Sequence, residues 1–169
     1  TLTLILSLLL LTACSAPTPT PLPPLVAPTP VQSLDPKNKT AIFEIDSANT
    51  TATYTVDETL FNENNRLNTA IGKTSKIAGQ MILNYNDPAQ SAFGTFLVDI
   101  SMLKSDSGNR DEMIRNQFLE SAKFPLATFT VKRVENFPAN PKEGQTLQFN
   151  LIGDMLVKQT TREVKWEVV

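Results

Sequence analysis

The side chains best suited to chemistry in this chain are two adjacent carboxylates, two nearby arginines and one cysteine. Asp111 and Glu112 are neighbours, Arg110 and Arg115 are five residues apart, and Cys14 is the single cysteine among 169 residues. The chain has no histidine, so it lacks the commonest general base and the commonest metal ligand. A Gly-x-Ser-x-Gly nucleophile motif is also missing. We therefore predict that the protein is not an enzyme, holds no metal and needs no cofactor.

The two carboxylates fit the first turn of a short amphipathic helix better than acid–base catalysis. Asn109 is placed to act as the N-cap, because its side-chain oxygen can accept from backbone N–H groups two or three residues further on. The helix dipole favours negative charge in that first turn. Pro125 prevents continuation, so the helix should end by about Ser121. Its apolar face would contain Met113, Ile114, Phe118 and Leu119.

The two arginines lie on different sides of this predicted helix. Arg110 can pair with a carboxylate across the helix end, or it can contact the polar headgroup of a ligand. Arg115 is the second candidate for a headgroup contact. Structural pairing and ligand binding are therefore alternatives that the sequence leaves open.

Residues 1–13 have the features of a lipoprotein signal peptide. The run 2–11 is apolar apart from two hydroxyl residues, which is too short to cross a bilayer but suits the h-region of a signal peptide. The motif Leu11-Thr12-Ala13-Cys14 then resembles a bacterial lipobox, in which the cysteine is lipidated and becomes the first mature residue. The alternative is a core segment that carries one buried cysteine. We expect an extracytoplasmic, membrane-anchored lipoprotein, on the periplasmic side or at the cell surface.

Residues 14–40 should comprise the lipidated cysteine and a disordered tether. Eight of the twelve prolines lie between Ser15 and Asn38, and such a tract cannot offset its ordering entropy by packing. At about 3.1 Å per residue in polyproline II it would reach on the order of 70 Å. A proline-rich recognition motif is the alternative. The net charge of -2 argues against nucleic acid as a partner, so the membrane, through the lipid anchor, is the expected one.

Residues 41–169 alternate apolar and polar side chains as β-strands do. The first two segments should form a hairpin that turns at 47–49, and 60–68 should be a loop. The pattern predicts an all-β fold, an antiparallel lipocalin-like barrel of about eight strands when complete, with one short amphipathic helix. Strands are expected at 42–46, 51–57, 76–85, 92–102, 126–135, 146–157 and 163–169. The sequence starts without methionine and stops in mid-strand, so we expect residues to be missing at both ends.

The region around the predicted helix is the most recognisable part of the chain. It contains Asn109-Arg110-Asp111, Ile114-Arg115, Phe118-Leu119, Phe124-Pro125 and Phe129. Together with 43–56 and 153–164, this set resembles the YceI-like family, in family order over residues 42–169. The resemblance implies a lipocalin-like barrel that binds a long-chain isoprenoid lipid, either a polyisoprenoid or an isoprenoid-quinone-like amphiphile.

Apolar positions of the predicted strands must face either a packed core or a ligand tunnel. A hollow barrel would sequester or carry the lipid that the resemblance implies. The alternative is a filled barrel that acts as a cell-surface interaction module without a small-molecule ligand. The sequence does not specify the oligomeric state or the identity of the lipid. The candidate lining residues are Tyr54, Met81, Leu83, Phe96, Val98, Ile100, Phe129, Phe149, Leu151 and Trp166.

Overall fold

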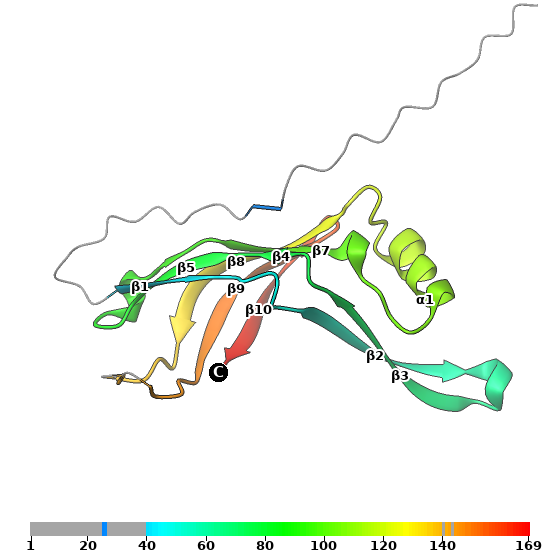
Figure 1. Ribbon diagram of the computed structural model, residues 1–169, viewed down its shortest axis with the longest axis horizontal. Coiled ribbons are helices and arrows are strands. Elements are labelled where there is room, and N and C mark those ends of the chain that lie inside the picture. The colour runs from blue at the N-terminus through cyan, green and yellow to red at the C-terminus, as the bar shows by residue number, and fades with distance from the viewer. Residues whose placement is uncertain (1–24, 27–39, 140, 143) are drawn as a thin grey trace, which may run out of the picture.

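The structure, a computed structural model, describes residues 25–26, 40–139, 141–142 and 144–169 (Figure 1). The predicted signal peptide, Cys14 and nearly all of the predicted tether lie outside these ranges. No helix in the described part of the chain is long and apolar enough to cross a bilayer. About half of the described residues belong to antiparallel strands, and a helical segment lies at one end of the molecule (Figure 1).

Ten strands within these ranges pair in three antiparallel sheets. The sheets have the orders β10-β9-β8-β7-β4, β1-β5-β6 and β2-β3. This confirms the predicted all-β antiparallel fold. The strands are β1 Thr40–Glu44, β2 Ala52–Leu60, β3 Arg66–Thr74, β4 Ile77–Ala78, β5 Gln80–Asn84, β6 Ala92–Phe93, β7 Thr95–Asp99, β8 Leu126–Glu135, β9 Phe149–Val157 and β10 Thr160–Val168.

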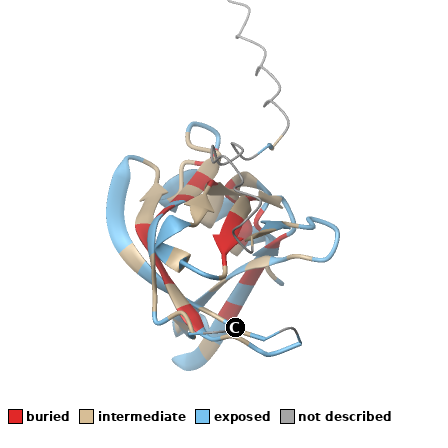
Figure 2. Ribbon diagram, turned by 90° about the vertical axis from the view of Figure 1, so that its left-hand side faces the viewer, coloured by how far each residue is buried: buried red, intermediate tan, exposed pale blue. Residues whose placement is uncertain are grey.

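Two glycines bend long strands and so join the two larger sheets. Only Gly79 separates β4 from β5, and only Gly94 separates β6 from β7. A Cβ atom on Gly79 would lie 2.1 Å from the ring of Phe96, so this position has no room for a side chain. The joined sheet therefore runs from β10 through the two bent strands to β1. It curls round a common centre, as Figure 2 shows along the direction of the strands.

The curled sheet does not close into the barrel that the sequence predicts. Within the described residues, β10 pairs only with β9, and β1 pairs only with β5. The predicted hairpin between the first two strands is also wrong, because β1 pairs with β5 while β2 pairs with β3. Since β2 turns away from the sheet instead of extending it, the sheet stays open between β1 and β10.

Residues 60–68, which the sequence assigned to a loop, contain the end of β2, the turn of the β2–β3 hairpin and the start of β3. A short 3-10 helix, η1 Phe61–Glu63, follows β2. Asn64 and Asn65 then adopt positive φ angles of 56° and 57°, a backbone region that asparagine tolerates better than most residues. The chain reverses there, and Leu60 pairs with Arg66. The hairpin projects from the sheet beside the helix (Figure 1).

The helix is short, as predicted, but begins differently. Helix α1 spans Gly108–Met113 and continues as a π-helical turn, Ile114–Phe118. Its N-cap is Ser107, whose hydroxyl accepts from the Arg110 N–H at 3.4 Å, so the prediction of Asn109 as N-cap is wrong. Because the helix starts two residues earlier than predicted, Asn109 lies inside its first turn. The predicted apolar face is only partly covered, since Met113 and Phe118 are exposed.

Two apolar clusters form the core. The first contains Phe129, Val131, Phe149 and Leu151, and the second contains Ile100, Leu103 and Ala127. Ile100 lies in a 3-10 helix, Ile100–Met102, rather than in the predicted strand. A β-bulge interrupts β8, where Val131 pairs with Gly153 but Arg133 pairs with Ile152. Lys132 is thus an extra residue in that strand, and Lys132 and Arg133 both lie exposed.

Candidate ligand-binding surface

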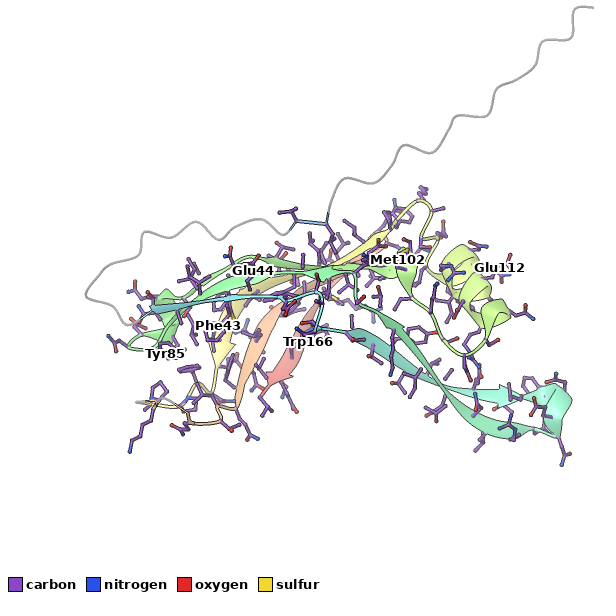
Figure 3. All side chains as sticks on the ribbon, in the orientation of Figure 1. Phe43, Glu44, Tyr85, Met102, Glu112 and Trp166 are labelled. Atoms are coloured by element: carbon purple, nitrogen blue, oxygen red, sulfur yellow. The ribbon has the colours of Figure 1, made fainter. Side chains whose placement is uncertain are left out.

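The inner face of the curled sheet is the side on which Phe129 and Leu151 are buried. Cross-strand pairing places rows of apolar residues on this face, because directly paired residues point to the same side. In Figure 3, Phe43 and Trp166 lie beneath the arch of the sheet, from strands at its two open edges. The rows are Phe96, Phe129 and Met155; Val131, Gly153 and Val164; Leu151 and Trp166; and Phe149 and Val168.

The structure places the ten predicted lining residues in or beside the core. Met81, Phe96, Phe129, Phe149 and Leu151 belong to the first cluster or pack against it. Tyr54, Val98 and Ile100 belong to the second cluster or pack against it. Leu83 is almost completely buried, with 1% of its surface exposed. It therefore belongs to the packed core and offers no open surface to a ligand. Trp166 is the opposite case, because 49% of its surface is exposed.

Aromatic rings contact one another along the inner face. The ring centroids of Phe96 and Phe129 are 6.5 Å apart, and those of Phe129 and Trp166 are 5.8 Å apart. A second group joins Phe137 to Phe149 at 5.3 Å and to Tyr85 at 6.5 Å. These distances are typical of tilted aromatic pairs.

Several inner-face residues are absent from the predicted set. Val164 and Val168 share the alternation of Trp166 on β10, so strand parity alone would have found them. Phe137 follows β8 in a loop, where no periodic pattern indicates its direction. The predicted set lacks one member of the first cluster, Val131, and seven residues that pack against it: Phe93, Val134, Phe137, Leu147, Met155, Val164 and Val168.

Two hollows lie at opposite parts of the molecule. One of about 340 Å³ lies at the end of β8, β9 and β10 and is lined by Phe149, Val168 and polar neighbours. The other, of about 220 Å³, lies on the helix and is lined by Asn109, Glu112, Met113, Asn116 and Gln117. The first is large enough for part of a small ligand, and it lies at the rim of the sheet, where Phe149 and Val168 have inner-face parity and Val169 follows β10.

Arg110 is held in a network of oxygen acceptors. Its guanidinium donates to both carboxylate oxygens of Glu58, at 2.5 and 3.2 Å, and to the hydroxyl of Ser105 at 3.1 Å. It also donates to Asp106. Asn68 donates to Glu58 at 2.7 Å. The bonds from Arg110, and then from Asn68, lower the pKa of Glu58, while Glu58 and Asp106 raise the pKa of Arg110.

Arg115 is also engaged within the protein. It donates to the backbone carbonyl of Leu103 at 3.0 Å. Asp111, which the sequence assigned to the helix start, is buried and accepts from both the N–H and the hydroxyl of Ser105, at 2.8 and 2.7 Å. These contacts give both arginines and Asp111 structural roles at the junction of the helix and the hairpin.

Tyr54 brings an unsatisfied hydroxyl to this junction. Its ring covers Gly72 on the paired strand, where a Cβ atom would lie 2.0 Å away from it. The phenolic oxygen is buried, and among the described residues its O–H has no acceptor at hydrogen-bonding geometry. Burial raises the pKa of Tyr54, only partly opposed by the nearby Ser105 hydroxyl, so the group stays protonated at neutral pH.

A curled antiparallel sheet with an apolar inner face defines the lipocalin-like class of proteins, in which small ligands are held on the inner side. The model of the YceI-like domain matches residues 43–169, so the chain belongs to the YceI-like family, whose fold is a polyisoprenoid-binding one. Among solved structures, BcnA of Burkholderia cenocepacia is similar in fold, with a TM-score of 0.55 and 17% identity over 74% of this chain and 70% of BcnA. No curated protein matches the chain.

Proposed function

We propose that this protein is a membrane-anchored, extracytoplasmic lipoprotein that sequesters or carries a polyisoprenoid or an isoprenoid-quinone-like amphiphile against its inner face. The observation that supports this proposal most is the apolar character of the inner face on β7 to β10. On β7 to β10 the paired inner positions carry aliphatic, aromatic, methionine or glycine residues, with two exceptions near the start of β10: Thr160, which pairs with Val157, and Arg162, which pairs with Met155.

The energetics favour a long apolar chain over a small polar ligand. Burial contributes about 0.8 kcal/mol per CH₂ group. Ten buried prenyl carbons would therefore contribute roughly 8 kcal/mol before the costs of association, so micromolar binding requires a longer buried chain. Trp166 and Phe43, both partly exposed beneath the arch, are the large side chains that such a chain would cover.

The anchor is supported by the sequence that precedes the domain. An apolar run ends at Leu11-Thr12-Ala13-Cys14 and is followed by a proline-rich tract. Stable anchoring needs two or more acyl chains or a second membrane signal, which a fully lipidated Cys14 would provide.

A filled domain that acts as an interaction module is the second candidate. It is favoured by Leu83, which has 1% exposure, and by the direct ring contacts of Phe129 with Phe96 and Trp166. These contacts fill part of the space that a ligand would occupy.

Fluorescence of the single tryptophan tests the proposal directly. Trp166 is the only tryptophan in the chain, and it lies on the inner face. Squalene or a geranyl-tailed benzoquinone, titrated into the full chain after organic extraction, should change the emission of Trp166 and raise the melting temperature. Mass spectrometry of the extract from native protein should show an isoprenoid lipid.

Adjacent residues on β10 provide a matched pair of variants. Val164 faces inward and Lys165 faces outward. Val164→Glu should weaken binding by at least tenfold, because a carboxylate would be buried against an apolar chain, whereas Lys165→Glu should bind like the wild type. Absence of extracted lipid, together with no response to either compound, would favour the interaction module.

A further inference from the structure

We infer that the hydroxyl of Tyr54 donates a hydrogen bond to an uncharged polar headgroup, which places the polar end of the ligand beside helix α1. This inference rests on the proposed function and specifies which end of an amphiphile lies at which end of the inner face. It favours a carbonyl-bearing head, such as a quinone, over a phosphate or diphosphate.

The first argument is that Tyr54 has a donor with nothing to accept it. The ring packs against the second apolar cluster, beside Ile100 and Leu103, while the oxygen is buried without a partner. Buried polar groups in native proteins are nearly always hydrogen-bonded, and an exception calls for an explanation. A ligand acceptor at this position would supply the missing bond.

The second argument is that the nearest hydroxyl cannot supply that bond. Ser105 has one proton and two lone pairs. Its Oγ lies 2.7 Å from Asp111 Oδ1, where the proton is donated, and it accepts from Arg110 at 3.1 Å and from the Ser107 N–H at 3.3 Å. Its capacity is thus used, so the donor of Tyr54 stays available.

The third argument concerns charge. The network beside Tyr54 contains three carboxylates, those of Glu58, Asp106 and Asp111, and a single guanidinium, that of Arg110. Three negative charges against one positive charge leave an excess of two negative charges. An anionic headgroup would be repelled there, and Arg110 could accommodate it only by leaving the carboxylates that it now contacts.

Arg162 offers the competing arrangement. Arg162, on β10, pairs with Met155 on β9 and therefore has inner-face parity, and it is exposed without an ion-pair partner among the described residues. An anionic head would bind there instead. The exposure of Arg162 to water weakens any such contact by screening, whereas the hydroxyl of Tyr54 is shielded from water.

Access of a headgroup to Tyr54 would require a small movement of helix α1, whose Arg110 and Asp111 lie close to it. Helix α1 contributes Asp111 to the buried residues and leaves Met113 exposed. It is held by the polar contacts of Arg110 and Arg115, and Leu119 beyond it packs against the second apolar cluster. A small shift of α1 that leaves Leu119 in place would not disrupt the apolar core.

The test compares three probes in the extracted full chain and in the variants Tyr54→Phe and Arg162→Gln. The probes are a geranyl-tailed benzoquinone, geranylgeranyl diphosphate and squalene, which has no polar head. Tyr54→Phe should weaken quinone binding five- to tenfold, as expected for one hydrogen bond, and should leave squalene binding unchanged. The melting temperature of the unliganded variant should not fall, because the lost hydroxyl had no partner.

Two results would overturn the inference while leaving the proposed function intact. One is equal quinone binding by wild type and Tyr54→Phe. The other is tighter binding of the diphosphate than of the quinone, with that preference lost in Arg162→Gln. Failure of wild type to bind any probe, squalene included, would instead refute the proposed function and this inference with it.

Discussion

Glu58 joins two parts of the chain that lie far apart in sequence. It is half-buried on the β2–β3 hairpin and accepts two hydrogen bonds from Arg110 at the start of helix α1. Arginine and carboxylate groups in this two-bond arrangement form one of the stronger polar contacts in proteins. The contact therefore sets how the hairpin lies against the helix.

Replacement of Glu58 by glutamine should lower the melting temperature in a pH-dependent way. Because the pKa of Glu58 is lowered in the folded state, its stabilisation is present above the unfolded pKa of about 4.3 and is lost as the pH falls through the folded pKa. The difference in melting temperature between wild type and Glu58→Gln should be largest near neutrality and should shrink below about pH 4. Circular dichroism melts from pH 7 to pH 3 measure it.

Glu63→Gln is the matched control for that experiment. Glu63 also pairs with an arginine, Arg66, at 2.7 Å, but both side chains are at least half exposed. Exposed pairs of this kind contribute little, so this variant should melt close to the wild type. A Glu58→Gln difference that stays constant across the pH range would contradict the role assigned to the ionised carboxylate.

At the residue scale, sequence analysis identified Arg110 but not its partner. Structural pairing was one of the two alternatives for this arginine, and the structure shows it paired. Glu58 could not be named because it lies 52 residues away on a hairpin that the alternation pattern did not predict. Tyr54 was predicted as a lining residue, but nothing in a sequence indicates that a hydroxyl will lack a partner.

At the scale of elements, the start of the helix depends on Ser107. Its hydroxyl accepts from the N–H of Arg110, and its carbonyl accepts from the N–H of Asp111. Ser107→Ala should therefore destabilise the protein by about 1 kcal/mol. Asn109→Ala should change the stability by less than about 0.5 kcal/mol, because Asn109 is exposed within the helix. Urea denaturation of both variants distinguishes the two positions, and a larger effect at Asn109 would restore it as the cap.

The close packing of β8 against β9 depends on Gly153. A Cβ atom there would lie 2.3 Å from the carbonyl oxygen of Thr130 and 2.9 Å from the ring of Phe129. Gly153→Ala should destabilise the protein by about 1–3 kcal/mol, because the backbone must move. Gly108→Ala is the control: nothing lies within 4 Å of its Cβ position, so it should be neutral or stabilising by up to about 1 kcal/mol. Equal effects of the two substitutions in urea denaturation would contradict this account.

The alternation of apolar and polar residues predicted the bounds of β8, β9 and β10 better than those of the earlier strands. Strand β8 has the predicted bounds, and β9 and β10 fall within a few residues of theirs, because their apolar residues meet a core on one side. Strand β3 was missed because Arg66, Asn68 and Lys73 interrupt its apolar pattern, and its outward Leu67 and Ile71 are exposed. Its buried positions, Ala70, Gly72 and Thr74, carry small or polar residues, so the buried face gives no apolar alternation in the sequence.

At the scale of the whole molecule, the fold class follows from composition and alternation, but closure of the barrel does not. Closure depends on which strand lies next to which, and alternation contains no information about partners. The sequence-based pairing of the first two strands was natural because neighbours along the chain often pair. The structure instead uses β5 as the partner of β1.

Removal of the predicted lipidation site should release the protein from membranes. Cys14→Ala in the full chain should prevent acylation, so the protein should be found in the soluble fraction or retain its leader. Mass spectrometry of the N-terminal peptide and membrane fractionation measure both effects. Equal incorporation of labelled palmitate by wild type and variant would refute lipidation at Cys14.

The β-bulge at Lys132 reverses the inside–outside parity of β8 for the rest of that strand. Ala127, Phe129 and Val131 face the core before it, whereas Val134 packs against the core after it. In a scan that places aspartate at every position of β8, the sensitive sites should thus be odd-numbered up to 131 and should shift to 134 beyond the bulge. Deletion of Lys132 should restore a single alternation of sensitive and tolerant positions along the whole of β8. A growth or binding selection could therefore detect the bulge without any structural measurement.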